Sequence, residues 1–216
     1  TPPVPSAIGI VRVSGEGAIE AVSAVFRAAS GRPLAACESR RLVYGTLLGH
    51  DGAPIDQALA TLSRAPYSYT GEDTAELQCH GSPAVLAMAL EALFAQGVRQ
   101  AGPGEFTKRA FLNGKLDLTQ AEAVMSLIGA AGRQGAALAR TALDGALAKR
   151  IDGFKQQLVA LAGHIAAWVD FPEEDVPALE PQALSATLAE VKAGLSDLIK
   201  NFGAGAVLRQ GVDAAI

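Results

Sequence analysis

Three charged side chains lie where a charge is costly unless it has a partner or a ligand. Arg12 is the lone charge of an apolar run, Glu76 alternates with apolar residues, and Lys115 follows Gly114 at the expected end of a helix. Such a charge must be paired or directed at a bound molecule. Each also has a structural explanation: Arg12 on a solvent-facing edge strand, Glu76 on the exposed face of a half-buried strand, and Lys115 against a helix dipole.

Cys79 and His80 are adjacent and invite a catalytic interpretation, because a thiol needs a neighbouring base to act as a nucleophile. Neighbours on a strand point to opposite faces, so the pair instead predicts a structural role for both residues. His50 and His164 add no metal-ligand spacing. The sequence therefore predicts no catalytic residue and no metal site in this segment.

Further charges are expected to be solvated. Glu105, Lys108 and Arg109 are interpreted as charges on the surface of a short helix. The acidic cluster Glu173 to Asp175 follows a proline and is interpreted as a loop, not as a cation site.

The first half of the chain must position the candidate residues with a sheet. Its β-like runs predict strands of a mainly antiparallel sheet at residues 7–13, 41–48, 55–62 and 74–78. A helix is expected over residues 18–29. Another begins at Ser82-Pro83, with serine as N-cap and proline in the first turn, and Gly97 can close it.

The second half predicts helices. Thr119 and Glu122 have the spacing of a capping box. A long helix follows, which Pro172 ends, and a second runs from about Pro181 to Phe202 before an apolar strand begins at Val207. Residues three and four apart give the first long helix an apolar seam that needs partners: Ile151, Phe154, Leu158, Leu161, Ile165 and Trp168.

Composition indicates a soluble globular protein in a reducing, cytoplasmic setting. Half of the 216 residues are hydrophobic, which suffices for a core without disulfides or metal. A net charge of -4 and a pI near 5.4 argue against a broad basic surface, so any contact with nucleic acid must be local or shared. The two cysteines form no C-x-x-C pair, and charges interrupt every apolar run before membrane-spanning length.

Three segments together resemble the amino-terminal part of the MnmE (TrmE) family of tRNA-modification GTPases. They are Ile8-Gly-Ile-Val-Arg-Val-Ser-Gly15, Tyr69-Thr-Gly-Glu-Asp-Thr-Ala-Glu-Leu-Gln-Cys-His-Gly81 and Gly102-Pro-Gly-Glu-Phe-Thr-Lys-Arg-Ala-Phe-Leu-Asn-Gly-Lys-Leu-Asp-Leu118. The resemblance covers nearly all of the chain. It implies an α+β fold, with a mainly antiparallel, aminomethyltransferase-like folate-binding domain at residues 1–115 and the first part of an all-α helical domain at residues 116–216.

The resemblance implies that a GTPase domain is inserted where this chain stops. The sequence has no G-x-x-x-x-G-K-S/T motif, so this segment is not expected to bind GTP through a P-loop or to be catalytic alone. In the family, the full-length protein is an enzyme that hydrolyses GTP and uses Mg2+ and K+. It forms a homodimer through the amino-terminal domain.

The resemblance also implies a site and a reaction. Arg12, Glu76 and Lys115 match the positions with which the family holds a reduced folate, 5-formyl- or 5,10-methylenetetrahydrofolate. A carboxylate such as Glu76 can accept paired N–H donors from the pterin edge, and Arg12 or Lys115 can pair with the folate carboxylates. With the flavoprotein MnmG (GidA), the family adds an aminomethyl or carboxymethylaminomethyl group to C5 of the wobble uridine of tRNA.

Two alternatives remain. The long apolar seam favours a helical dimerisation scaffold without folate binding. A stand-alone one-carbon transferase fits less well, because the folate region has no clear acid/base pair and half of the chain is helical.

Overall fold

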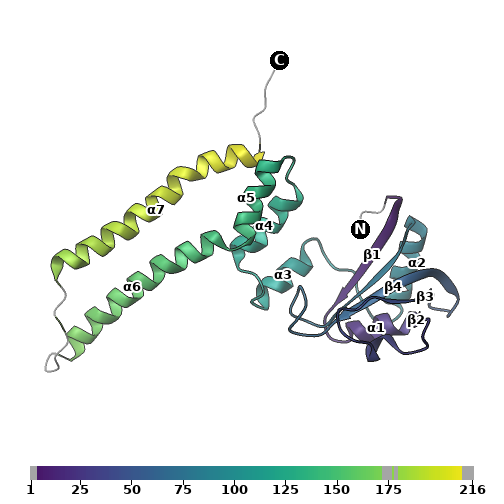
Figure 1. Cartoon of the computed structure of the whole chain (residues 1–216). Coiled ribbons are helices and arrows are strands. Elements are labelled where there is room, and N and C mark those ends of the chain that lie inside the picture. Colours follow the sequence, from purple (N-terminus) through teal and green to yellow (C-terminus); the bar gives the residue numbers. More distant parts are fainter. Residues whose placement is uncertain (1–3, 172–176, 178–179, 211–216) are drawn as a thin grey trace, which may run out of the picture. The chain divides into compact units, whose positions relative to one another are not determined.

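The structure is a computed structural model that describes residues 4–171, 177 and 180–210, and for residues 201–210 the backbone alone. The chain divides into two compact units, Thr1–Leu116 and Asp117–Ile216. The first unit combines a sheet with helices, and the second is helical (Figure 1).

A five-stranded antiparallel sheet forms the first unit. Its order is β1-β5-β4-β3-β2, so β1 lies at one edge beside β5. The predicted α+β fold is confirmed, and each predicted strand is present with slightly different ends. The strands are β1 Ser6–Ser14, β2 Phe26–Ala28, β3 Val43–Leu48, β4 Pro54–Ser63 and β5 Thr74–Gly81.

Helices α1 (Ala18–Ala24) and α2 (Pro83–Phe94) pack against one face of this sheet. Alternate side chains of the strands enter the core between them, where Leu62 and Leu77 are 1% and 0% exposed. The end of α2 is as predicted, because Gly97 has a φ of 83° and the following N–H donates to the Leu93 carbonyl. Ser82 occupies the N-cap position, but its hydroxyl makes no capping hydrogen bond.

The helix predicted over residues 18–29 is wrong in its second half. Helix α1 ends at Ala24, and Phe26–Ala28 form strand β2, which pairs with Gly45–Leu47 of β3. Phe26 and Ala28 are buried and Arg27 is exposed, which is the alternation of a strand. Pairing with the free edge of β3 therefore outweighs the helix propensity of the alanines.

The second unit contains four helices among its described residues: α4 (Leu118–Ile128), α5 (Arg133–Leu143), α6 (Ala146–Asp170) and α7 (Pro181–Gln210). Helix α6 ends at Asp170, as the proline two residues later predicts. Helices α6 and α7 come close at Gly194, where an added Cβ would lie 2.7 Å from the Phe154 ring atom Cε1. The acidic cluster predicted to be a loop, residues 173–175, lies outside the described residues.

Two details of the helical unit differ from the prediction. The capping box begins at Asp117, whose carboxylate accepts the Gln120 N–H at 2.8 Å while the Gln120 side chain accepts the Asp117 N–H at 2.9 Å. Aspartate is as good an N-cap as threonine, so the box forms two residues earlier than Thr119. The strand expected from Val207 is also wrong over residues 207–210, which continue α7. The glycines before it weaken a helix without ending it.

The apolar seam of α6 is largely uncovered. No residue of α6 is buried, and Ile151, Leu158, Ile165 and Trp168 are 39–50% exposed. The neighbouring helix α7 thus covers only part of the seam. None of the described helices is both long enough and apolar enough to cross a membrane.

Candidate functional site

Arg12 and Glu76 form an ion pair across the two neighbouring strands β1 and β5. Their Cα atoms are register partners, and Arg12 Nε donates to Glu76 Oε1 at 2.6 Å. Both side chains project from the face of the sheet opposite the core, with 42% and 24% exposure. The structure therefore brings together two of the three predicted site residues.

Two aromatic rings hold the Arg12 guanidinium. Its Cζ lies 6.0 Å from the ring centre of Tyr69 and 5.8 Å from that of Phe106. Rings at this distance attract a cation through their π faces. Tyr69 and Phe106 lie in the two long segments noted in the sequence, but nothing in their spacing predicts contact with Arg12.

Lys115 contacts the loop that carries Tyr69. Its Nζ donates to the Pro66 carbonyl at 3.1 Å, and its stem passes Gly71, where an added Cβ would lie 3.1 Å from Lys115 Cγ. Gly71 has a φ of 79°, so glycine meets both the backbone and the space requirement. Lys115 and Arg12 are thus connected through one loop, and no hydrogen bond joins their side chains directly.

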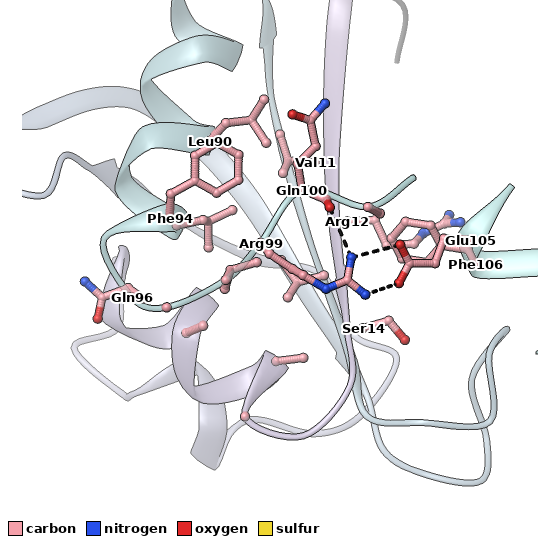
Figure 2. A pocket seen from close by; sticks show the side chains of 18 of the residues that line it. Val11, Arg12, Ser14, Leu90, Phe94, Gln96, Arg99, Gln100, Glu105 and Phe106 are labelled. Atoms are coloured by element: carbon pink, nitrogen blue, oxygen red, sulfur yellow. Dashed lines mark hydrogen bonds and ion pairs between the residues drawn. The ribbon is translucent and has the colours of Figure 1, made fainter. Parts of the chain in front are cut away.

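Beside Arg12 lies a cavity of about 540 Å3. Leu90 and Phe94 of α2 form an apolar wall, and the polar groups of Arg12 and Arg99 line another part (Figure 2). Figure 2 shows the Arg99 guanidinium hydrogen-bonded to the Glu105 carboxylate within this cavity. The cavity therefore combines apolar surface with the paired charges of Arg12, Arg99 and Glu105.

The prediction of solvated helix-surface charges is wrong for Glu105 and Arg109 of α3 (Glu105–Leu112). Glu105 binds Arg99 and Arg109 and accepts the Gly102 N–H at 2.8 Å. Hydrogen bonds from Arg99 in particular hold the pKa of Glu105 well below its usual range. Lys108 is exposed, as predicted. The bonds that reverse the prediction depend on residues brought together only by the fold.

Cys79 and His80 point to opposite faces of β5, as expected. Cys79 is buried, its thiol lies 3.7 Å from the Gly9 carbonyl, and burial raises the pKa of the thiol. His80 is exposed, and its Nδ1 lies 2.8 Å from Asp56 Oδ1. The two side chains do not form a nucleophile and base. Among the described residues, no group of three or more His, Cys, Asp and Glu side chains could hold a metal ion.

Comparison with known proteins agrees with the two-part organisation of the chain. Residues 1–115 match the family model described as GTP-binding protein TrmE N-terminus, and residues 118–213 match the MnmE helical domain.

Several curated relatives carry the name tRNA modification GTPase MnmE. One from Thermus thermophilus is 49% identical over 198 residues, which are 91% of this chain and 45% of that protein. Those from Carboxydothermus hydrogenoformans and Aquifex aeolicus are 40% and 42% identical, and each match covers 100% of this chain and 47% of the relative. The chain spans about half the length of the curated relatives it matches.

Proposed function

The chain belongs to the MnmE family of tRNA modification GTPases, and on that basis we propose that it is the folate-binding and dimerising portion of such an enzyme. The whole protein would hydrolyse GTP with Mg2+ and K+ in the cytoplasm. With the flavoprotein MnmG, it would modify C5 of the wobble uridine of tRNA. This portion would supply the homodimer contact and the site for 5-formyl- or 5,10-methylenetetrahydrofolate.

The observation that carries the proposal is the Arg12–Glu76 pair on the open face of the sheet. Arg12 uses Glu76 Oε1, and Glu76 Oε2 accepts no hydrogen bond from the described residues. A carboxylate held in place by an arginine, with one oxygen available, suits the adjacent N–H donors of a pterin edge. Ala75 and Leu77, the neighbours of Glu76 on β5, are buried and fix the strand from which Glu76 projects.

Lys115 suits the carboxylate end of the folate better than Arg12 does. Arg12 is already neutralised by Glu76 and lies near two rings, whereas Lys115 Nζ is bonded to a neutral carbonyl. A lysine ammonium has three donors on a flexible stem, so it can keep one bond and turn the others to a ligand anion. We therefore assign the pterin to Glu76 and the folate tail to Lys115.

Isothermal titration of the 216-residue chain with 5-formyltetrahydrofolate tests the proposal. Wild type should bind saturably as a dimer, with its mass measured by light scattering in the same buffer. Glu76→Ala should abolish binding and leave the dimer intact. Glu38→Ala is the matched control, because Glu38 also pairs with an arginine, Arg41, but is 72% exposed. Unchanged affinity in Glu76→Ala would remove Glu76 from the site, and a folded wild-type dimer without binding would refute the folate assignment.

A second candidate, a helical dimerisation scaffold without folate binding, is favoured by one observation. The seam on α6 stays exposed, with Trp168 at 50%. Apolar surface of this extent needs a partner. If the chain acts only as a scaffold, Leu158→Asp should disrupt assembly while Arg12→Ala leaves function unchanged.

A further inference from the structure

We infer that Arg109 is a positioning residue for the proposed folate site, because it fixes the helix that holds both Arg12 and Lys115. This inference rests on the proposed function. Arg109 itself need not touch the folate. Its role follows from its contacts with Glu72 and Glu105 and from the contacts that other residues of α3 make.

Arg109 is the centre of a group of four paired charges and one hydroxyl, here called the Arg109 cluster: Arg99, Glu105, Arg109, Glu72 and Ser14. Its Nη1 lies 3.1 Å from both carboxylate oxygens of Glu72. Its Nε and Nη2 donate to Glu105 Oε1 at 3.1 and 2.9 Å. The planar fork of an arginine is suited to bridging two carboxylates in this way.

The cluster joins α3 to the end of β1. Glu72 Oε2 accepts the Ser14 hydroxyl at 2.8 Å, and Ser14 Oγ lies 2.7 Å from the hydroxyl of Thr70, which is completely buried. Ser14 is two residues beyond Arg12, on the same face of the same strand. Arg109 therefore fixes α3 relative to the strand that carries Arg12.

Phe106 and Thr107 of α3 hold the Arg12 side chain, Phe106 directly and Thr107 through Tyr69. Phe106 places its ring 5.8 Å from the guanidinium carbon. Thr107 Oγ1 lies 3.0 Å from the Tyr69 hydroxyl, and the Tyr69 ring lies 6.0 Å from the same carbon. A shift of α3 would move one ring directly and release the other.

The end of α3 positions Lys115. Asn113 Nδ2 donates to the Thr70 carbonyl at 2.8 Å, and the Lys115 N–H donates to the Ala110 carbonyl at 2.8 Å. Gly114 between them has a φ of 67°, which turns the chain so that Lys115 can reach Pro66. Arg12, which holds Glu76, and Lys115, the proposed contact for the folate tail, thus both depend on one helix.

The bonding of Arg109 argues against a direct role in anion binding. Nε, Nη1 and Nη2 each donate to a carboxylate, and the side chain is 31% exposed. A ligand carboxylate would have to displace Glu72 or Glu105 and leave that charge without its partner. Lys115 faces no such competitor.

Titration of full-chain variants with 5-formyltetrahydrofolate tests the inference. Arg109→Met keeps the apolar stem and removes the donors. It should weaken binding roughly 10- to 100-fold, the range seen when groups that orient metal ligands are removed. Arg140→Met is the matched control, because Arg140 pairs with Asp144 at the exposed surface of α5. Arg140→Met should bind as wild type does, and Arg109→Met binding as tightly as wild type would overturn the inference.

A double-mutant cycle with Arg12→Lys separates positioning from general loss of structure. If Arg109 acts through Arg12, Arg109→Met should weaken binding less in the Arg12→Lys background than in wild type. Equal losses in both backgrounds would show that Arg109 does not act through Arg12 and would contradict the inference.

Tyr69→Phe covers the case in which Arg109→Met does not fold. It leaves the Arg109 cluster intact and removes only the hydroxyl that contacts Thr107. Binding should weaken several-fold, and wild-type affinity would refute the link through α3.

If wild type itself does not bind, the proposed function fails and the inference fails with it. Failure of the inference alone requires binding by wild type.

Discussion

Replacing Gly9 by alanine should loosen the contact between β1 and α2, and thereby the strand that carries Arg12. Gly9 is buried, and an added Cβ would lie 2.7 Å from Leu86 Cδ2 and 3.1 Å from Cδ1 and Cγ. All three atoms belong to the end of one side chain. Leu86 must therefore change its rotamer or push α2 away from the sheet.

The magnitude follows from these contacts. Adding a methyl group to a filled core costs about 1–3 kcal/mol, and the lower end applies here because the clash involves only a side-chain end. Leu86→Ala alone removes a side chain that is 8% exposed. It should cost about 2–5 kcal/mol through lost burial and a cavity. In the double variant the new methyl enters the vacated space, so Gly9→Ala should add almost nothing.

Native-state hydrogen exchange of the β1 amides measures these changes within the first unit. We expect a coupling of about 1 kcal/mol between the two substitutions. Gly153→Ala is the control, because an added Cβ there meets nothing within 4 Å. It should stabilise α6 by about 0.5–1 kcal/mol. Equal destabilisation by Gly9→Ala in the wild-type and Leu86→Ala backgrounds would refute the packing argument.

Three further predictions concern single groups. Because burial raises the pKa of Cys79, a thiol-alkylating reagent should modify Cys37 before Cys79 in the folded protein, as peptide mass spectrometry can measure, and equal rates would contradict the burial. Because the bond from Arg99 lowers the pKa of Glu105 from its ordinary 4.5, the stabilisation by Glu105 is present above that value and lost as the pH falls below it. Thermal unfolding of Glu105→Gln should therefore match wild type more closely in acid than at neutral pH, and a constant difference would contradict this. Asp117→Ala should destabilise α4 by about 1 kcal/mol, measured by exchange of its first-turn amides, and unchanged exchange would contradict the cap.

Local patterns predicted much of the sheet because their physical causes are local. Alternation in β1 and β5 placed Arg12 and Glu76 on the same kind of face, and glycine at residue 97 marked the end of α2. The predicted helix over residues 18–29 failed in its second half because strand β2 has only three residues. Its conformation comes from pairing with β3, which the sequence of β2 alone does not specify.

The sequence singled out Arg12 and Glu76 but did not predict that they pair with each other. Arg12 and Glu76 each had a solvent-facing explanation, and both residues are indeed on an open face. Their ion pair arises because β1 and β5, 64 residues apart at this point, are neighbours in register. Neither strand contains information about the partner across it, so the pair required the strand order of the folded sheet.

The Arg109 cluster shows the same limit more strongly. Glu105 and Arg109 are four residues apart on α3, and this spacing alone predicts an ordinary surface pair. Glu72, 37 residues before Arg109, gives this pair a structural role because it brings a second carboxylate to the Arg109 guanidinium. A charged residue whose helical spacing predicts a surface position can connect two elements when the fold places an opposite charge against it. The variants of Arg109 therefore test a property of the assembled unit, and no isolated α3 peptide could reproduce it.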